Sequence, residues 1–359
     1  MVKRSTAAGL RRRLIAAGIV ATVLPFAACA ANPEKPSAAG DSAELAVVFQ
    51  PAAESLAMVN QLYAFASDSF AEAGIDVTYN PLIANAVQAS QAVATGAADI
   101  GVVASNGTLA AVGNGLDVVS VATITKGSTT QITLRDDVIK RLGVKPDAPI
   151  QERVEALKGL SLALPTPGSM TDLMTRKLLS TYGVDPDKEV TIRPITEPSA
   201  LVTAAREGQV DGFAFSPPTS VQPVDGGYGS VWITLAEVPE FQQLPFCDII
   251  TSRKFITENP KAVAAFLNVM TDAASAIESD PDAAGEMVRA KYYDQLDPAL
   301  WTLAWDSSYP TGLKGFEPSE KGFDLLLQII NDQADEPVEV AFEAVYDTTF
   351  LDDLTGDAS

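Results

Sequence analysis

Short apolar runs alternate with longer amphipathic stretches along most of the chain after residue 42. In the first block the runs predict strands at 45–49, 75–79, 100–103 and 118–124. The stretches between them repeat apolar residues three and four positions apart, which predicts helices at 56–73, 85–95 and from 105 onward. Strands separated by helices indicate parallel β-α-β units, whose ligand sites lie at the carboxyl ends of the strands.

A second block continues the alternation. Strands are predicted at 131–134, 160–164, 190–194, 210–215, 231–235 and 247–251, with helices at 150–157, 169–182 and 198–206. Beyond residue 252 the pattern is mostly helical, with helices expected from Pro260 and at 281–292, 298–305 and 319–332. We expect these last helices to pack on the first sheet. The chain then crosses between the blocks twice, near 123–131 and 245–251, and the two crossings form a hinge.

One short pattern occurs in both blocks. A glycine stands three residues before an aspartate at Gly96 and Asp99, and again at Gly208 and Asp211. In each case a helix ends, the glycine supplies a left-handed cap, and the aspartate precedes a buried strand. A single junction of this kind is common in α/β proteins, whereas two of them, each followed by a polar or proline loop, predict two similar lobes that face one another.

The stretch 159–218 most directly predicts a binding site. A short apolar strand breaks at Pro165-Thr166-Pro167-Gly168, and a helix begins at Ser169. A strand, tight loop and helix leave free backbone N–H groups and the positive end of the helix dipole at the mouth of a crevice. This arrangement suits a small anionic ligand. The alternative is that Ser169 only caps the helix.

Composition narrows the function. The 359 residues are enough for two domains, 47% are hydrophobic and none is histidine, which excludes histidine-based triads and histidine-ligated metals. We find no nucleophile elbow, phosphate loop or metal-ligand cluster, and we expect neither an enzyme nor a bound cofactor or metal. Cys247 lies in an apolar run and is expected to be a buried packing residue. The acidic tail 347–357 is expected to be solvated rather than a calcium site.

The charge balance restricts the partners. Net charge is −21, and residues 1–28 hold five Lys and Arg with no acid, so removing them leaves −26. So acidic a surface argues against nucleic-acid binding. An anionic ligand must then be held by local N–H groups, with Lys126 the best basic candidate, although a solvated hinge lysine is the alternative. Binding an anion also works against the repulsion of the negative net charge, and a neutral or zwitterionic ligand avoids this cost.

The N-terminus reads as a targeting segment. A basic region and an apolar run too short to cross a membrane predict a signal peptide at 1–28, followed by Cys29 and a flexible tether at 29–42. The segment resembles a bacterial lipoprotein signal, which implies lipidation of Cys29 and extracytoplasmic anchoring to the cell membrane. An ordinary secretory signal is the alternative, and twin-arginine export stays open.

Several segments resemble the substrate-binding lipoproteins of bacterial ABC importers, in the branch of sulfonate, taurine, nitrate and NMT1-like pyrimidine-precursor binders. The matching segments are 94–102, 156–159, 168–169, 208–213 and 255–262. The resemblance implies an α/β, two-lobed periplasmic-binding-protein fold of type II, with a mostly parallel sheet in each lobe. Lobe 1 would comprise 43–124 and 250–359, and lobe 2 would comprise 125–249.

The strand ends then predict the ligand contacts. On the first lobe they are Phe49, Gln50, Ser55, Ser105 and Asn106, and on the second Gly168, Ser169, Met170, Pro217 and Thr219. The resemblance implies capture of a small, anionic or heterocyclic molecule by hinge closure and delivery to a permease and its ATPase. We expect a monomer.

Two other functions are left open. One is a sensing or adhesion module on the same fold. The other is an enzyme related to the pyrimidine-precursor branch, but the histidine- and iron-dependent chemistry of that relative cannot be transferred to a chain without histidine.

Overall fold

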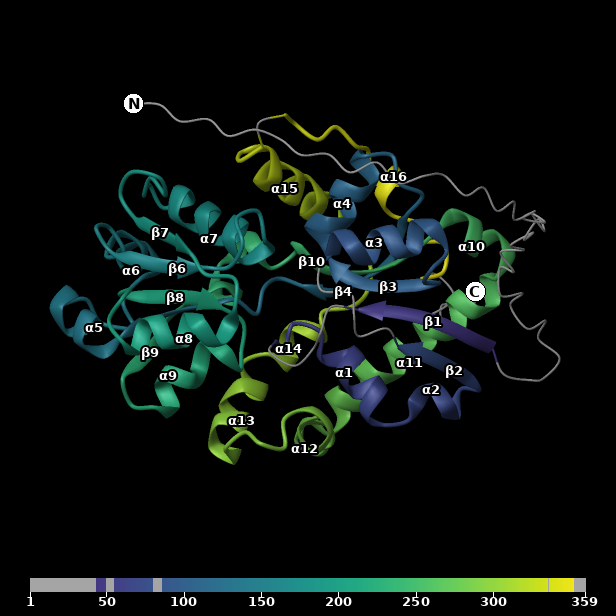
Figure 1. The fold of residues 1–359 in the computed structure, drawn as a ribbon, viewed down its shortest axis with the longest axis horizontal. Coiled ribbons are helices and arrows are strands. Elements are labelled where there is room, and N and C mark those ends of the chain that lie inside the picture. The colour runs from purple at the N-terminus through teal and green to yellow at the C-terminus, as the bar shows by residue number, and fades with distance from the viewer. Residues whose placement is uncertain (1–42, 50–54, 80–85, 335, 352–359) are drawn as a thin grey trace, which may run out of the picture. The chain divides into compact units, whose positions relative to one another are not determined.

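A computed structural model describes residues 43–49, 55–79, 86–334 and 336–351 (Figure 1). These residues form two five-stranded sheets flanked by helices, which confirms the predicted α/β class. No helix in these ranges has both the length and the apolar character needed to cross a membrane. The predicted signal peptide, tether and Cys29 lie outside the described residues.

The first sheet has the strand order β2-β1-β3-β10-β4. Its strands are β1 Ala43–Phe49, β2 Ile75–Tyr79, β3 Ile100–Ala104, β4 Val119–Lys126 and β10 Pro245–Thr251. Its helices include α1 Val59–Ala66, α2 Ser69–Glu72, α3 Ala86–Thr95 and α4 Ser105–Gly113. β1 is parallel to β2 and β3, whereas β10 is antiparallel to both of its neighbours.

The second sheet has the order β7-β6-β8-β5-β9. Its strands are β5 Gln131–Arg135, β6 Ser161–Leu164, β7 Thr191–Pro194, β8 Gly212–Phe215 and β9 Gly229–Thr234. Its helices are α5 Asp136–Leu142, α6 Ile150–Glu155, α7 Met170–Thr181, α8 Pro198–Arg206 and α9 Gln222–Asp225. β5 is antiparallel to β8 and β9. In each sheet the antiparallel strand is therefore the one that arrives directly from the other sheet.

The repeated glycine and aspartate residues have the same conformation and hydrogen bonds in both sheets. Asp99 accepts a 2.8 Å hydrogen bond from the Ala46 N–H through Oδ2 and returns its own N–H to the Ala46 carbonyl at 2.7 Å. Asp211 makes the same pair with Ser161, at 2.8 Å in both directions. The two glycines have φ of +74° and +69°. The predicted internal similarity of the two blocks is confirmed at the level of hydrogen bonds.

Two short connectors join the sheets. Residues 127–130 lead from β4 to β5, and residues 235–244 lead from β9 to β10. They are hydrogen-bonded to each other, from the Gly127 N–H to the Leu244 carbonyl at 2.8 Å and from the Leu235 N–H to the Thr130 carbonyl at 2.9 Å. The first connector lies within the predicted crossing at 123–131. The second precedes the predicted 245–251, which β10 occupies, and the lobe boundaries remain a prediction.

The C-terminal helices return to the first sheet. They are α10 Arg253–Glu258, α11 Pro260–Ser279, α12 Pro281–Tyr292, α13 Pro298–Asp306, α14 Tyr309–Gly312, α15 Glu320–Asn331 and α16 Phe342–Val345. α11 packs on α1, and the ring of Phe266 lies 5.2 Å from that of Phe70, centroid to centroid. This helix buries its apolar stripe against α1 and α2, which flank the first sheet, as its periodicity predicts. By contrast, α13 also contacts α9 and α15 also contacts α7, both beside the second sheet.

One local prediction was wrong, and one helix was not predicted. The single helix expected at 56–73 is broken between α1 and α2 at Asp68, whose φ of 57° is left-handed. Ser67, Asp68 and Ser69 are weak helix formers, and Asp tolerates that conformation. The helix α5 was not predicted, because it spans only seven residues, four of them charged, and its apolar repeat covers a single turn.

Candidate ligand-binding site

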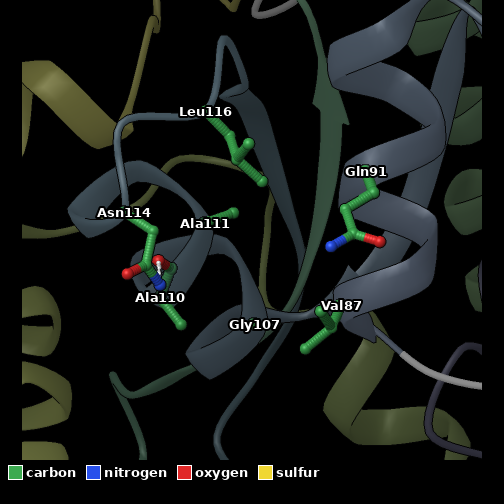
Figure 2. A pocket seen from close by; sticks show the side chains of 7 residues that line it. All are labelled: Val87, Gln91, Gly107, Ala110, Ala111, Asn114 and Leu116. Carbon is green, nitrogen blue, oxygen red and sulfur yellow. Dashed lines mark hydrogen bonds between the residues drawn. The ribbon is translucent and has the colours of Figure 1, made fainter.

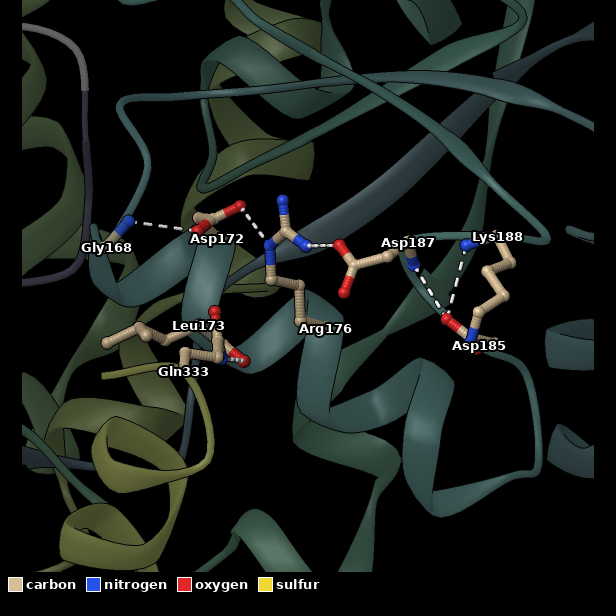
Figure 3. Close-up of polar contacts among 8 residues, drawn as sticks. All are labelled: Gly168, Asp172, Leu173, Arg176, Asp185, Asp187, Lys188 and Gln333. Atoms are coloured by element: carbon tan, nitrogen blue, oxygen red, sulfur yellow. Dashed lines mark hydrogen bonds and ion pairs between the residues drawn. The ribbon is translucent and has the colours of Figure 1, made fainter. Parts of the chain in front are cut away.

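The loop before α7 is fixed by two hydrogen bonds to Asp172, and Figure 3 shows the one from Gly168. Ser169 is the N-cap residue, and its Oγ accepts from the Asp172 N–H at a long 3.4 Å. The Asp172 carboxylate reaches back through Oδ2 to the Gly168 N–H at 2.9 Å. Gly168 has a φ of +77°, which favours glycine. This differs from a standard capping box, because the Asp172 carboxylate accepts from the residue before the N-cap and the Ser169 N–H donates to the Thr166 carbonyl instead. Ser169 does cap the helix, although the long bond leaves its hydroxyl oxygen with spare accepting capacity.

Asp172 is itself buried and charge-compensated. Its Oδ1 accepts from Arg176 Nε at 2.9 Å, and Arg176 Nη1 pairs with Asp187 at 2.8 Å (Figure 3). Burial lowers the pKa of Arg176, but the hydrogen bonds and charges of the two carboxylates raise it above its ordinary value. The carboxylate that shapes the loop is therefore paired with a guanidinium on the next turn. Sequence reasoning missed Asp172, although its spacing from Ser169 is the signature of a capping box.

The first sheet meets this loop through the start of α4. Asn106 Nδ2 donates a 2.9 Å hydrogen bond to the Gly168 carbonyl. Ser105, one residue earlier, has no exposed surface, and its side chain turns towards the interior beside Asp248. Asn106 and Gly168 are thus brought together as two predicted site residues, whereas the Ser105 hydroxyl faces the core.

A second contact joins the two sheets nearby. Ser55 pairs with Pro218 as an isolated antiparallel bridge, and the Leu56 N–H donates to the Pro217 carbonyl at 2.8 Å. Thr219 is buried at the start of the short helical turn Thr219–Val221. Ser55, Pro217 and Thr219 therefore lie at one seam between the sheets. We call the two contacts, Asn106 with Gly168 and Ser55 with Pro218, the interlobe seam.

The remaining predicted residues are placed as follows. Met170 is 5% exposed and packs in the hydrophobic core, so its side chain faces away from solvent. Its N–H, in the first turn of α7, has no intrahelical acceptor. Phe49 ends β1, but its side chain, like Gln50, lies outside the described residues.

Lys126, the basic residue predicted as a candidate for anion binding, is hydrogen-bonded to another segment. Its Nζ donates to the Glu317 carbonyl at 3.0 Å and borders a cavity of about 510 Å³ lined mainly by α11 and the segment 313–317. Burial lowers the pKa of Lys126, the Glu317 carboxylate raises it, and the nearby Lys314 lowers it further. Lys126 is therefore bonded to the segment 313–317 and lines the cavity there.

A smaller hollow of about 200 Å³ lies between α3 and α4 (Figure 2). Its lining is mostly apolar and contains no charged residue. A Cβ at Gly107 would lie 2.5 Å from that of Ala86, so glycine is what allows the two helices to approach there. The hollow is a packing feature of the first sheet's helices, with no predicted contact residue in its lining.

The described residues offer no metal site and no activated thiol. Among them, no cluster of three or more Cys, Asp or Glu side chains could hold a metal ion. Cys247 is fully buried, and burial, reinforced by the charge of Asp248, raises its thiol pKa far above the ordinary value. It is an inert packing cysteine.

Comparisons with known proteins point to one group. The model of the NMT1-like family matches residues 40–291. The nitrate/nitrite binding protein NrtA of Nostoc sp. (strain PCC 7120 / SAG 25.82 / UTEX 2576) is 27% identical over 127 residues, which are 35% of this chain and 28% of that relative's length.

Two solved structures are similar over most of the chain. The periplasmic aliphatic sulphonate binding protein SsuA from Escherichia coli has a TM-score of 0.65 at 17% identity, covering 86% of this chain and 99% of that one. The periplasmic nitrate-binding protein NrtA from Synechocystis PCC 6803 has a TM-score of 0.55 at 15% identity, covering 79% and 75%. These likenesses confirm the predicted type II periplasmic-binding-protein fold.

Proposed function

The chain belongs to the NMT1-like family, and on this premise we propose that it is the extracytoplasmic solute-binding component of an ABC importer. The observation that supports this most is the interlobe seam between two sheets of the same strand order, joined by two hydrogen-bonded connectors. A solute that touches both sheets gains all its contacts only when they are together. Its binding free energy therefore favours the closed arrangement.

For the solute we propose a small anion or heterocycle bound beside the start of α7. α7 is 12 residues long, and the N–H groups of Met170 and Thr171 in its first turn have no intrahelical acceptor. Asp172 occupies the Gly168 N–H, but Arg176 balances its charge. Relatives named for nitrate, nitrite and aliphatic sulphonate binding support the same class.

A ligand screen tests this directly. We expect one of nitrate, taurine, aliphatic sulfonates, small carboxylates or pyrimidine-like heterocycles to raise the melting temperature of the soluble domain. At a hundredfold excess over the dissociation constant, the added free energy of unfolding is about 2.7 kcal/mol. That corresponds to a rise of about 5 °C for a protein of this size. If none of these classes raises the melting temperature, the proposed ligand class is wrong.

The variant Ser169→Trp should abolish that rise without unfolding the protein. An indole at the N-cap fills the space in front of the free N–H groups of α7, whereas the core side of the helix is unchanged. The matched variant Ser169→Ala removes only the hydroxyl and should cost about 1 kcal/mol of stability as a lost cap. Full ligand binding by Ser169→Trp, measured by calorimetry, would move the site away from α7.

We further propose that the mature protein is lipid-anchored through Cys29 and works as a monomer with a permease and an ATPase. In cells, Cys29→Ser should shift the protein from the membrane fraction to the soluble fraction, as followed by immunoblotting. Retention of the serine variant on the membrane would contradict the anchor. A sensing role, rather than transport, would be indicated if deleting the gene left uptake of the identified solute unchanged.

A further inference from the structure

Asp248 is a fully buried carboxyl in the middle of the first sheet. It lies on β10 between Val103 of β3 and Thr123 of β4, and the Thr123 hydroxyl donates to its Oδ1 at 3.0 Å. Its Oδ2 accepts no well-formed hydrogen bond from the described residues. No lysine or arginine pairs with it within that part of the chain. A buried acid without a counter-ion is costly, so its role requires an explanation.

Three hydroxyl groups lie near this carboxyl, and none of them has a partner at hydrogen-bonding distance among the described residues. They are those of Ser105, Thr108 and Tyr346, all in buried residues. Ser105 and Thr108 lie close enough to lower the pKa of Asp248, and the Asp248 charge raises that of Tyr346. Ser105 and Thr108 are the first and fourth residues of α4. The carboxyl is therefore in contact with the first turn of the helix that supplies Asn106.

The titratable groups facing Asp248 are few. Cys247 and Tyr346 are buried beside it, and both have raised pKa values, mainly from burial. α3 and α4 carry no charged side chain, and the charged residues of α15 and α16 are exposed. Burial raises the pKa of Asp248 to about 7, against the lowering effect of the Ser105, Thr108 and Thr123 hydroxyls. Both protonation states are therefore accessible near neutral pH.

We propose that Asp248 is a positioning residue for the first turn of α4, and through it for the hydrogen bond between Asn106 and Gly168. When ionised, the carboxylate only accepts, so the Ser105 and Thr108 hydroxyls, which lie beside it without a partner in the described part of the chain, would turn to donate to it and hold the turn against β10. When protonated, one of its oxygens becomes a donor, and a hydroxyl must turn to accept. Asn106 lies between these two residues in sequence, so the two hydrogen-bond patterns place its amide differently.

This inference rests on the proposed function for its consequence, since Asn106 matters only if the interlobe seam binds a solute. The physical step is independent of any ligand. We therefore choose a measurement on the ligand-free protein, the side-chain amide resonance of Asn106 in ¹⁵N–¹H spectra of deuterated protein, assigned with Asn106→Ala. Failure of the ligand screen would then leave this test unaffected.

The wild-type Asn106 resonance should shift with pH along a single titration with a midpoint near 7. Asp248→Asn should abolish the shift. Thr108→Val, which removes one hydroxyl on the α4 side, should reduce its amplitude. Thr123→Val acts on the β4 side and should move the midpoint while preserving the amplitude.

An Asn106 resonance that stays constant while the Asp248 carboxyl titrates, as followed by ¹³C, would overturn the proposal. So would a titration that persists in Asp248→Asn. If Asp248→Asn does not fold, the contrast between Thr108→Val and Thr123→Val decides, and equal amplitudes in both would count against a link through α4.

Discussion

Replacing Asp248 with asparagine is expected to stabilise the protein at pH 8 by about 4 kcal/mol and to change its stability little at pH 4. Burial raises the folded-state pKa of Asp248 from 3.8 to about 7. Between these values the folded state keeps a proton that the unfolded state has lost. Unfolding then releases a proton, so the free energy of unfolding of the wild type falls as pH rises through this range and levels off above 7. Asparagine has no titratable proton, so its contribution to the free energy of unfolding does not change with pH.

Urea denaturation of both proteins between pH 4 and 9 measures this difference. The chain has no histidine, so no imidazole titration obscures the range near pH 7. Taking the difference between the two proteins cancels contributions from other groups. Asp187→Asn is a control on the surface, because that carboxylate is 77% exposed and its loss should change the free energy of unfolding by less than about 1 kcal/mol. Parallel profiles for wild type and Asp248→Asn would contradict the raised pKa.

Asp172→Ala is expected to lower the free energy of unfolding by about 3 kcal/mol and to weaken solute binding at least tenfold. The side chain is 3% exposed, and its loss leaves the Gly168 N–H and one face of Arg176 without an acceptor. The loop at Gly168 then loses the bond that sets its left-handed turn. Its carbonyl, which accepts from Asn106, is no longer held in place. Denaturation and calorimetry with the solute found by screening measure the two effects.

The variant Asp187→Ala distinguishes the effect of the loop geometry at Gly168 from the effect of the charges around Arg176. Asp187 pairs with the outer side of Arg176 but does not touch Gly168. As a mostly exposed partner it should cost less than about 1 kcal/mol and leave affinity unchanged. Equal losses of affinity in both variants would mean that the net charge around Arg176, and not the loop geometry, matters for binding.

Sequence reasoning was most accurate where local chemistry decides structure. Helix α8 begins and ends where the apolar spacing predicts, with Pro198 in its first turn. The strand β2 and the helix α12 also match their predicted bounds. Repeated glycine and aspartate positions predicted two similar blocks, because a left-handed glycine and a carboxylate that accepts from a neighbouring strand need only short stretches of chain.

The arrangement of the candidate site residues could be predicted only in part, because it depends on packing as well as on local sequence. Asn106 and Gly168 were both expected at strand ends, and they do lie together. However, the sequence does not indicate that Ser105 turns inward to Asp248 while Asn106 turns outward to Gly168. One residue of helix rotation separates the two directions, and only the packing of α4 on β10 fixes it.

The sequence by itself determined the class of fold, the order of the strands and of the longer helices, and the loops at the strand ends, since these follow from apolar periodicity and from the backbone preferences of glycine and proline. The tertiary structure alone decided that β5 and β10 enter the sheets antiparallel, that Asp172 holds the Gly168 loop, and that Asp248 is buried beneath α4. Each of these depends on atoms brought together across long separations in the chain, where burial and hydrogen-bond geometry, rather than local preference, set the energy.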